Sequence, residues 1–465
     1  MIHFLLIPFF YSIQCSDENW LQKKCEPSCI FQQGTLDSNN LNLFPKNCSS
    51  ICADLVIDAD SNLTENELIP TFKNVKIIFG TIIISRTNLT SLKFLAGLES
   101  LECDDIASDP DLNNPKNGLK LYKNFEMTEI GMINWTNTSC SVQIEMYANF
   151  SNFNVPNLKN FNSSDPSKHE IYIQYDYFGI ISQNYVCFSL EETSNFYGAE
   201  NVVMSYQNQK YCDHLSSTVF GEKLCKIPEN ENIKNLEENC QRIFGILKIG
   251  PGDENFVYKL KNVTWIYGKL IIENTTLTSI DFLNNLEFVI SFNEQCETSS
   301  LQFSHNKNLM EIRLPNLKRI FGILKIGPGD EKFVYKLKNV TWIYGQLIVE
   351  NTNLTSINFL NNLGFVISFD NYWKRSSLQI LQNKNLMEIK LPNLKKVLGG
   401  YNPFVITGNN GNFANFSKIC SEIRHVLYKA PSNVPYVDRQ TCEAIQKKNM
   451  ERVQILEILK VFRNR

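Results

Sequence analysis

The chain has 465 residues, of which 43% are hydrophobic and 20% are charged. These values are typical of folded globular proteins and argue against a disordered chain or a coiled coil. Its 45 basic and 48 acidic residues leave a net charge of −3, so there is no excess of positive charge for binding nucleic acid or an acidic membrane surface. The length predicts more than one domain.

The amino terminus carries an apolar run from Phe4 to Ile13. The run is too short to span a bilayer, and its position predicts a secretory signal peptide over residues 1–15. A buried amino-terminal strand is the alternative. No later apolar stretch reaches the length of about 20 residues that a transmembrane helix needs. We therefore expect a secreted, extracellular protein.

The chain contains 14 cysteines, and two C-x3-C pairs begin at Cys25 and Cys48. In a secreted protein such cysteines form disulfides. A zinc site is the alternative, but no histidine lies between or beside the pairs. Removal of Cys15 with the signal peptide would leave an odd number of thiols. The disulfide candidates are Cys25, Cys29, Cys48, Cys52, Cys103, Cys140, Cys187, Cys212, Cys225, Cys240, Cys420 and Cys442.

Asn-x-Ser/Thr sequons point to the same compartment, because they are glycosylated only in the secretory pathway. Attached glycans would mark turns that face solvent. The candidate N-glycosylation sites are Asn47, Asn62, Asn88, Asn134, Asn137, Asn149, Asn162, Asn262, Asn274, Asn339, Asn353 and Asn415.

A tandem duplication occupies the second half of the chain. The segment RIFGILKIGPGDE begins at Arg242 and returns 77 residues later at Arg319, and the two copies align without a gap as far as Lys395. Strand-like runs begin near Leu247, Leu270, Leu301, Leu324, Leu347 and Leu378, at steps of 23, 31, 23, 23 and 31 residues. Three steps make one repeat, so the duplication adds whole coils. This pattern predicts a β-rich solenoid, in which each coil contacts only its neighbours.

A related segment upstream, residues 72–98, aligns without gaps on residues 337–363, which indicates two domains with one plan. The apolar spacing of Val453, Leu456, Leu459 and Val461 predicts an amphipathic helix in the tail, which packs on its own domain or, alternatively, on a membrane surface or a partner. The predicted divisions are a signal peptide (1–15), a cysteine-containing segment (16–47), a first domain (48–212), a disulfide-tied linker (213–239), a second, lengthened domain (240–420) and a helical tail (421–465).

The motif KNVTWIYGQLIVENTNLTSINFLNNL, which begins at Lys338, is followed by NKNLMEIKLPNLK from Asn383. These residues resemble the receptor L domain, the ligand-binding module of the insulin and epidermal growth factor receptors, over most of residues 48–420. The resemblance implies two right-handed β-helices related to leucine-rich repeats, with short helices and a broad sheet that binds a polypeptide. The chain lacks a furin-like cysteine-rich block and kinase motifs, so we expect no signalling by the chain alone.

Alternation with a period of two residues places Leu270 and Ile272 on one face of their strand and Lys269, Ile271 and Glu273 on the other. The second set makes a mixed apolar and polar face that suits a polypeptide ligand. The alternative is that the protein's own loops or helices cover these isoleucines. The candidate ligand face comprises Thr81, Ile83, Ser85, Lys269, Ile271, Glu273, Gln346, Ile348 and Glu350.

The two copies differ most at residues 293–298 and 370–375. Six consecutive changes indicate an exposed loop, and unconstrained drift is the simpler explanation of them. Cys296 is the candidate for an unpaired thiol, because Trp373 replaces it in the second copy. The candidate contact loop consists of Tyr372, Trp373, Lys374 and Arg375.

The GPGDE turns favour structure over calcium, because the two carboxylates of each turn are too few for that ion. Pro-Gly predicts a type II turn, and Asp253 a helix N-cap. Asn306, Asn308, Asn383 and Asn385 are predicted to stack along the solenoid and to satisfy backbone groups.

Catalytic motifs are missing from the sequence, and the histidines are scattered, so we expect neither an enzyme nor a bound cofactor or metal. The predicted function is that of an extracellular glycoprotein that binds a secreted peptide or protein through its L-domain sheets. The alternative is a structural or adhesive solenoid. Nucleic acid is not an expected partner, and the sequence does not indicate the oligomeric state.

Overall fold

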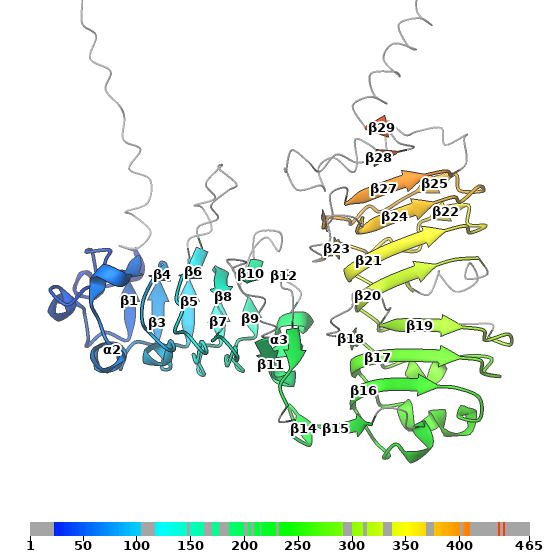
Figure 1. Ribbon diagram of the computed structural model, residues 1–465, viewed down its shortest axis with the longest axis horizontal. Helices are drawn as coiled ribbons and strands as arrows, with labels where there is room; N and C mark the ends of the chain where they lie inside the picture. The colour runs from blue at the N-terminus through cyan, green and yellow to red at the C-terminus, as the bar shows by residue number, and fades with distance from the viewer. Residues whose placement is uncertain are drawn as a thin grey trace, which may run out of the picture. The chain divides into compact units, whose positions relative to one another are not determined.

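The computed structural model divides the chain into two compact units. Unit 1 covers Met1–Val186 and Glu192–Ser205, and unit 2 covers Cys187–Glu191 and Tyr206–Arg465. Both units are β-rich, with strands that lie side by side in rows (Figure 1). The structure describes residues 23–103, 117–146, 149–161, 170–175, 186–199, 203–205, 209–213, 215–228, 232–291, 300–309, 314–328, 337–368, 376–399, 403–409, 436–437 and 440–441.

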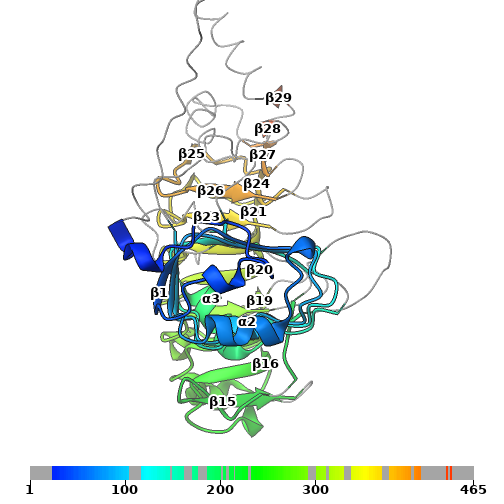
Figure 2. The same cartoon turned by 90° about the vertical axis from the view of Figure 1, so that its left-hand side faces the viewer.

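Unit 1 contains two parallel sheets. The five-stranded sheet has, in spatial order, β1 (Ser50–Cys52), β3 (Ile77–Phe79), β5 (Ser100–Glu102), β7 (Asn137–Thr138) and β9 (Asn160–Phe161). The six-stranded sheet has β12 (Val203–Ser205), β10 (Glu170–Tyr175), β8 (Ser141–Met146), β6 (Asn117–Tyr122), β4 (Ile82–Ser85) and β2 (Leu55–Ile57). The chain therefore alternates between the two sheets. Figure 2 looks nearly along this row, and successive passes of unit 1 lie behind one another.

Short helices occupy the turns and one end of unit 1. They are η1 (Pro27–Cys29), η2 (Leu41–Leu43), η3 (Ala59–Ser61), α2 (Glu65–Phe72), η4 (Lys93–Leu95) and α3 (Leu190–Gly198). Phe196 of α3 packs edge-on against Phe153, with ring centroids 5.5 Å apart. The buried Glu192 accepts a hydrogen bond from the backbone N–H of Val155 at 2.6 Å. Helix α3 thus covers an end of the hydrophobic core that would otherwise be exposed.

Unit 2 contains one sheet of 14 strands. Its main path is β14 (Thr218–Val219), β15 (Glu222–Ile227), β16 (Arg242–Ile249), β17 (Trp265–Glu273), β18 (Phe288–Ile290), β20 (Arg319–Ile326), β21 (Trp342–Glu350), β24 (Leu378–Leu381), β27 (Phe404–Thr407), β28 (Tyr436–Val437) and β29 (Gln440–Thr441). β19 (Leu301–Ser304) pairs with β17, and β23 (Phe365–Ile367) pairs with β21 and with β26 (Lys396–Leu398).

Smaller elements complete unit 2. The two small sheets are β11 (Val186–Phe188) with β13 (Gln209–Tyr211), and β22 (Ser356–Ile357) with β25 (Glu388–Ile389). The short helices are η5 (Ile233–Asn235), η6 (Glu254–Leu260) and η7 (Asp281–Leu283).

Long strands bend at glycine. In β17 the residues before Gly268 pair with β18, whereas those after it pair with β19. Gly268 has φ +149°, and a Cβ there would collide with the backbone of Gly245 on the neighbouring strand. Only glycine tolerates both conditions, so one strand can serve two parts of the sheet.

Two of the strand starts predicted from the sequence, Leu301 of β19 and Leu378 of β24, are those of the structure, whereas β16, β17, β20 and β21 each begin five residues before the predicted leucine. Leu247, Leu270 and Leu301 lie opposite one another on neighbouring strands. The same ladder begins again 77 residues later, at Leu324. Leucine and isoleucine side chains at alternate positions of these strands point into one core, which is continuous from Cys225 to Ile406. Both copies of the repeat therefore contribute to the interior of the same unit.

Two segments differ from expectation. Within 213–239, β15 pairs in parallel with β16, so this segment begins the sheet of unit 2 and also carries the Cys225–Cys240 disulfide. The expected helical tail contains strands β28 and β29, of which β28 pairs with β27. The rest of the tail and the proposed signal peptide lie outside the described residues.

Candidate binding surfaces

The candidate ligand face of unit 2 lies on the side of the sheet opposite to the core. Leu270 and Ile272 are fully buried, whereas Lys269, Ile271 and Glu273 are half-buried. In the second copy Ile348 and Glu350 are half-buried in the same way. The side chains of Ile271 and Ile348 therefore combine apolar surface with access from solvent.

A row of side chains crosses the strands on this face. Lys248 of β16 lies opposite Ile271, which lies opposite Gln302 of β19. Three strands further on, Lys325, Ile348 and Gln379 repeat the arrangement. Sequence analysis identified the isoleucines but not their lysine and glutamine neighbours, because it considered each strand without its cross-strand partners. We call these six residues the cross-strand row.

Ion pairs flank both isoleucines. The ammonium of Lys248 lies 2.8 Å from the carboxylate of Glu273. The equivalent pair, Lys325 and Glu350, lies at 2.6 Å. Both lysines are more than half exposed, at 56% and 57%. Such exposed pairs contribute little to stability, so the charges remain available to a ligand.

Three members of the predicted face are less accessible than expected. Ser85 is 1% exposed and Gln346 is 4% exposed, so neither can contact a ligand on this surface. Burial lowers the pKa of Lys269, the counterpart of Gln346 in the first copy. Alternation predicts the side of the sheet on which a residue lies, but neighbouring side chains decide how much of it solvent can reach.

Unit 1 presents a comparable face on its six-stranded sheet. The Thr81 hydroxyl and backbone N–H both donate to Asp54 Oδ1, at 2.9 and 3.0 Å. Ile83 lies opposite Lys120 of β6, and Lys120 lies opposite Gln143 of β8. Ile83, Lys120 and Gln143 are half-buried. Sequence analysis missed Lys120 and Gln143, although alternation in LKLY and SVQIEM could have indicated them.

A second outward surface of unit 2 is formed by the first parts of β16 and β17 together with β18. Unlike the candidate ligand face, it carries aromatic side chains that solvent does not reach. Trp265 stacks on Phe288 at 3.9 Å, and their copies Trp342 and Phe365 stack at 3.7 Å. These four rings are all buried. The rings of this aromatic surface are therefore covered, and the surface is not an open binding face.

Part of the cover over that aromatic surface is described. Tyr211 of β13 packs edge-on against Phe244 at 5.3 Å and donates from its hydroxyl to the Ile290 carbonyl at 2.6 Å. A disulfide joins Cys187, within β11, to Cys212, which directly follows β13. The first copy of the aromatic surface is thus packed against a covalently braced element of the same unit.

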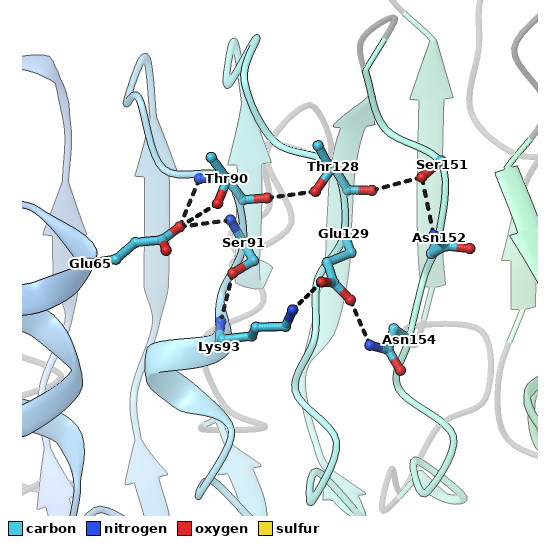
Figure 3. Close-up of polar contacts among 9 residues, drawn as sticks. All are labelled: Glu65, Thr90, Ser91, Lys93, Thr128, Glu129, Ser151, Asn152 and Asn154. Atoms are coloured by element: carbon cyan, nitrogen blue, oxygen red, sulfur yellow. Dashed lines mark hydrogen bonds and ion pairs between the residues drawn. The ribbon is translucent and has the colours of Figure 1, made fainter.

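A third surface of unit 1 carries polar contacts between successive turns of the chain (Figure 3). Glu65 of α2 accepts hydrogen bonds from the Thr90 hydroxyl and backbone N–H, at 2.7 and 2.9 Å. The Thr128 hydroxyl donates to the Thr90 carbonyl at 3.2 Å, and the Ser151 hydroxyl to the Thr128 carbonyl at 3.5 Å. These side chains satisfy one another and the backbone, which indicates a structural role.

A charged row runs beside these hydroxyls. The Lys93 ammonium lies 2.5 Å from the Glu129 carboxylate, which also accepts a hydrogen bond from the Asn154 amide at 2.6 Å. Burial raises the pKa of Glu129, but the hydrogen bonds from Lys93 and Asn154 and the Lys93 charge lower it by more. The net pKa of Glu129 is therefore below its ordinary value.

Asparagines bridge neighbouring turns, as the sequence predicted for Asn306 and Asn383; Asn383 is buried and Asn306 half-buried. The Asn306 amide donates to the Ile272 carbonyl at 2.8 Å, and the Asn383 amide to the Val349 carbonyl at 3.0 Å. Asn124 makes the same contact in unit 1, to the carbonyl of Ile84 at 2.9 Å. The position is structural in both units.

The GPGDE turn contributes structure as well. Gly252 has φ +92°, and the Asp253 N–H donates to the Gly250 carbonyl at 3.2 Å, which confirms the type II turn. Asp253 occupies the N-cap position of η6, as predicted, but its carboxylate accepts from the Gly250 N–H at 2.9 Å and makes no hydrogen bond to the helix. Glu254 accepts hydrogen bonds from Thr276, as Glu65 does from Thr90.

Five disulfides are present among the described residues, and they use ten of the predicted cysteines. The two amino-terminal C-x3-C pairs bond to each other, as Cys25–Cys52 and Cys29–Cys48, and not internally. The other three are Cys103–Cys140, Cys187–Cys212 and Cys225–Cys240. Cys296, Cys420, Cys442 and the contact loop Tyr372–Arg375 lie outside the described residues.

Metal chemistry finds no support in the part of the chain that the structure describes, where no group of His, Cys, Asp or Glu side chains is arranged to hold an ion. Among the same residues, no helix is both long and apolar enough to cross a membrane.

The parallel sheets and their outward faces define a class of protein. The model of the receptor L domain family matches residues 47–155, 239–321 and 318–429, more than half of the chain, and the chain belongs to this family. Protein irld-34 of Caenorhabditis elegans is 25% identical over 166 residues, which are 33% of this chain and 41% of that protein. The match thus spans less than half of the relative's length.

Proposed function

We propose that the protein is a secreted glycoprotein that recognises a peptide or protein partner through the outward sheet faces of its two units, without catalysis or signalling of its own. Membership of the receptor L domain family supports an extracellular binding role. The five disulfides fit an oxidising compartment.

We also infer that each unit is a right-handed β-helix, and that the duplication lengthens the second. The support is that the chain returns to the same sheet at each pass and always pairs in parallel between β15 and β28. Connections between parallel strands are nearly always right-handed. A helix of this kind extends by whole turns, so the 77-residue insertion needs no new core.

The main support for the proposed function is the composition and solvent exposure of the outward faces. They hold half-buried isoleucines beside exposed lysines, a composition that suits a polypeptide interface. Among the described residues, no sequon asparagine lies on a strand of these faces: Asn88, Asn274 and Asn353 all follow the strand end. Glycans at these sites would leave the faces open.

The test compares two variants of the glycosylated protein in capture from extracellular fluid. Ile271→Lys with Ile348→Lys places charge on the proposed face. Ile133→Lys with Met387→Lys is the matched control, because these apolar residues are 45% and 67% exposed but lie outside the strands of the face, Ile133 on a turn and Met387 directly before β25. We expect the first pair alone to abolish capture of a partner that binds wild type saturably. Equal capture by both variants would contradict binding through the face and favour a structural spacer.

A further inference from the structure

The cross-strand row on unit 2 is duplicated along one continuous sheet. Lys248, Ile271 and Gln302 occupy neighbouring strands, and the second set follows in the same order. Within the row β17 pairs with β19 and β20 pairs with β21, and β19 lies next to β20. Ile271 and Ile348 are therefore three strands apart on one rigid support, where a ligand meets two equal apolar sites.

The spacing of these two sites selects a ligand conformation. Neighbouring strands lie about 4.8 Å apart, so three steps separate the isoleucines by about 14 Å. An extended chain covers about 14 Å in four residues, and an even number of residues keeps both side chains on one face. In an α-helix about 14 Å corresponds to nine or ten residues, which project in different directions. The row therefore fits an extended segment better than a helix.

The polar side chains between the two isoleucines indicate which side chain the ligand carries at its central position. The central side chain of such a segment would stand about 7 Å from each isoleucine, between Gln302 and Lys325. The glutamine amide and the lysine ammonium are both hydrogen-bond donors. Although Lys325 pairs with Glu350, its ammonium has three donors and is largely exposed. An acidic or amide side chain is the complementary group.

We propose that unit 2 binds an extended polypeptide segment with two apolar side chains four residues apart and an acidic or amide side chain midway. This inference rests on the proposed function, because it uses the same sheet face. It adds the conformation of the ligand and the pattern of its side chains.

Labelled peptides of one composition test the spacing with the full-length protein. STITETITS places its isoleucines four residues apart, whereas STITEITTS and SITETTITS place them three and five apart. We expect STITETITS to bind at least about tenfold more tightly in fluorescence anisotropy, the effect of one well-buried aliphatic contact. Ile271→Lys and Ile348→Lys should each reduce its affinity to that of the controls.

A lysine outside the cross-strand row supplies the control for charge. Lys325 lies between the isoleucines, whereas Lys390 forms an exposed ion pair with Glu388 at 2.8 Å and is not part of the row. Lys325→Glu should weaken STITETITS by about tenfold and favour STITKTITS instead, as expected for reversal of a close charge pair. Lys390→Glu should leave both affinities within about twofold of wild type. Circular dichroism of each variant checks that the fold is intact.

The inference would be overturned if the three peptides bound with equal affinity or if none of them bound. Equal effects of the two lysine variants would overturn it as well. The capture experiment distinguishes failure of this inference from failure of the proposed function. If the double isoleucine variant still loses its partner, the face binds a ligand of another shape. If capture is unchanged as well, the proposed function falls with the inference.

Discussion

Single side chains connect one turn of the chain to the next. Asn383 is fully buried, and its carbonyl accepts from the Thr352 N–H at 2.9 Å while its amide donates to the Val349 carbonyl at 3.0 Å. Donor and acceptor are both needed, so neither a carboxylate nor an apolar group can replace this amide. The recurrence of the contact at Asn124 and Asn306 follows from that requirement.

Asn383→Asp should lower the free energy of unfolding by about 2 kcal/mol, because it removes the donor to Val349 and buries a carboxyl group. Urea denaturation followed by circular dichroism measures the loss. Asn385→Asp, two residues away and exposed, is the control and should change stability by less than about 0.5 kcal/mol. A similar loss in both variants would show that the amide bridge is not the cause.

The Lys93–Glu129 pair makes stability depend on pH. The folded pKa of Glu129 is lowered, so its stabilising effect is present above the unfolded pKa and is lost as pH falls through the folded value. We expect Glu129→Gln to lower the Tm at pH 6 and to have a shrinking effect as the pH falls below about 4. Glu126→Gln, at an exposed position of the same turn, should show no such trend. A constant Tm difference between pH 3 and pH 6 would contradict this.

At the scale of strands, the long strands of unit 2 depend on a glycine at the bend. Gly268 and Gly345 occupy the same position of the two copies, with φ +149° and +141°. At both, a Cβ would meet the carbonyl of a glycine on the preceding strand. These glycines allow β17 and β21 to change direction while keeping their pairing on both sides of the bend.

Gly268→Ala should destabilise unit 2 by about 3 kcal/mol or prevent its folding, because a collision with backbone adds to an unfavourable φ. Gly252→Ala is the matched control: it also has a positive φ, +92°, but has open space around it. It should cost only about 1 kcal/mol. Thermal unfolding of both variants gives the comparison, and equal losses would assign the whole effect to φ.

A feature of the fold or of the candidate site can be predicted from the sequence when it is determined along the chain, and not when it depends on contacts between turns. The 23-residue step from Leu247 to Leu270 on the next strand and the burial of Leu270 follow from periodicity, which acts along the chain, and the structure agrees. The burial of Ser85 and the pairing of Cys25 with Cys52 depend on neighbours across turns. A single sequence indicates such neighbours only where a repeat fixes the register, so the sites of unit 1 were the least predictable.

For the molecule as a whole, the duplication offers a test of how unit 2 is built. Its core runs through both copies without interruption, and β16 and β20 have the same sequence, RIFGILKI. Deletion of residues 242–318 joins Gln241 to Arg319 and presents β20 to β15. Leu224 and Cys225, which now lie opposite Arg242 and Ile243, would meet identical residues.

The 77-residue deletion should therefore fold, whereas deletion of residues 242–280, about half as long, should not. Removal of a whole repeat keeps every remaining strand opposite a neighbour of the right sequence, but removal of half a repeat shifts core positions out of register. Circular dichroism, a cooperative thermal transition and a monodisperse gel-filtration peak would identify the folded variant. If the in-phase deletion aggregates as readily as the out-of-phase one, turns of unit 2 are not interchangeable, and the proposal that it grows by whole turns of a β-helix is wrong.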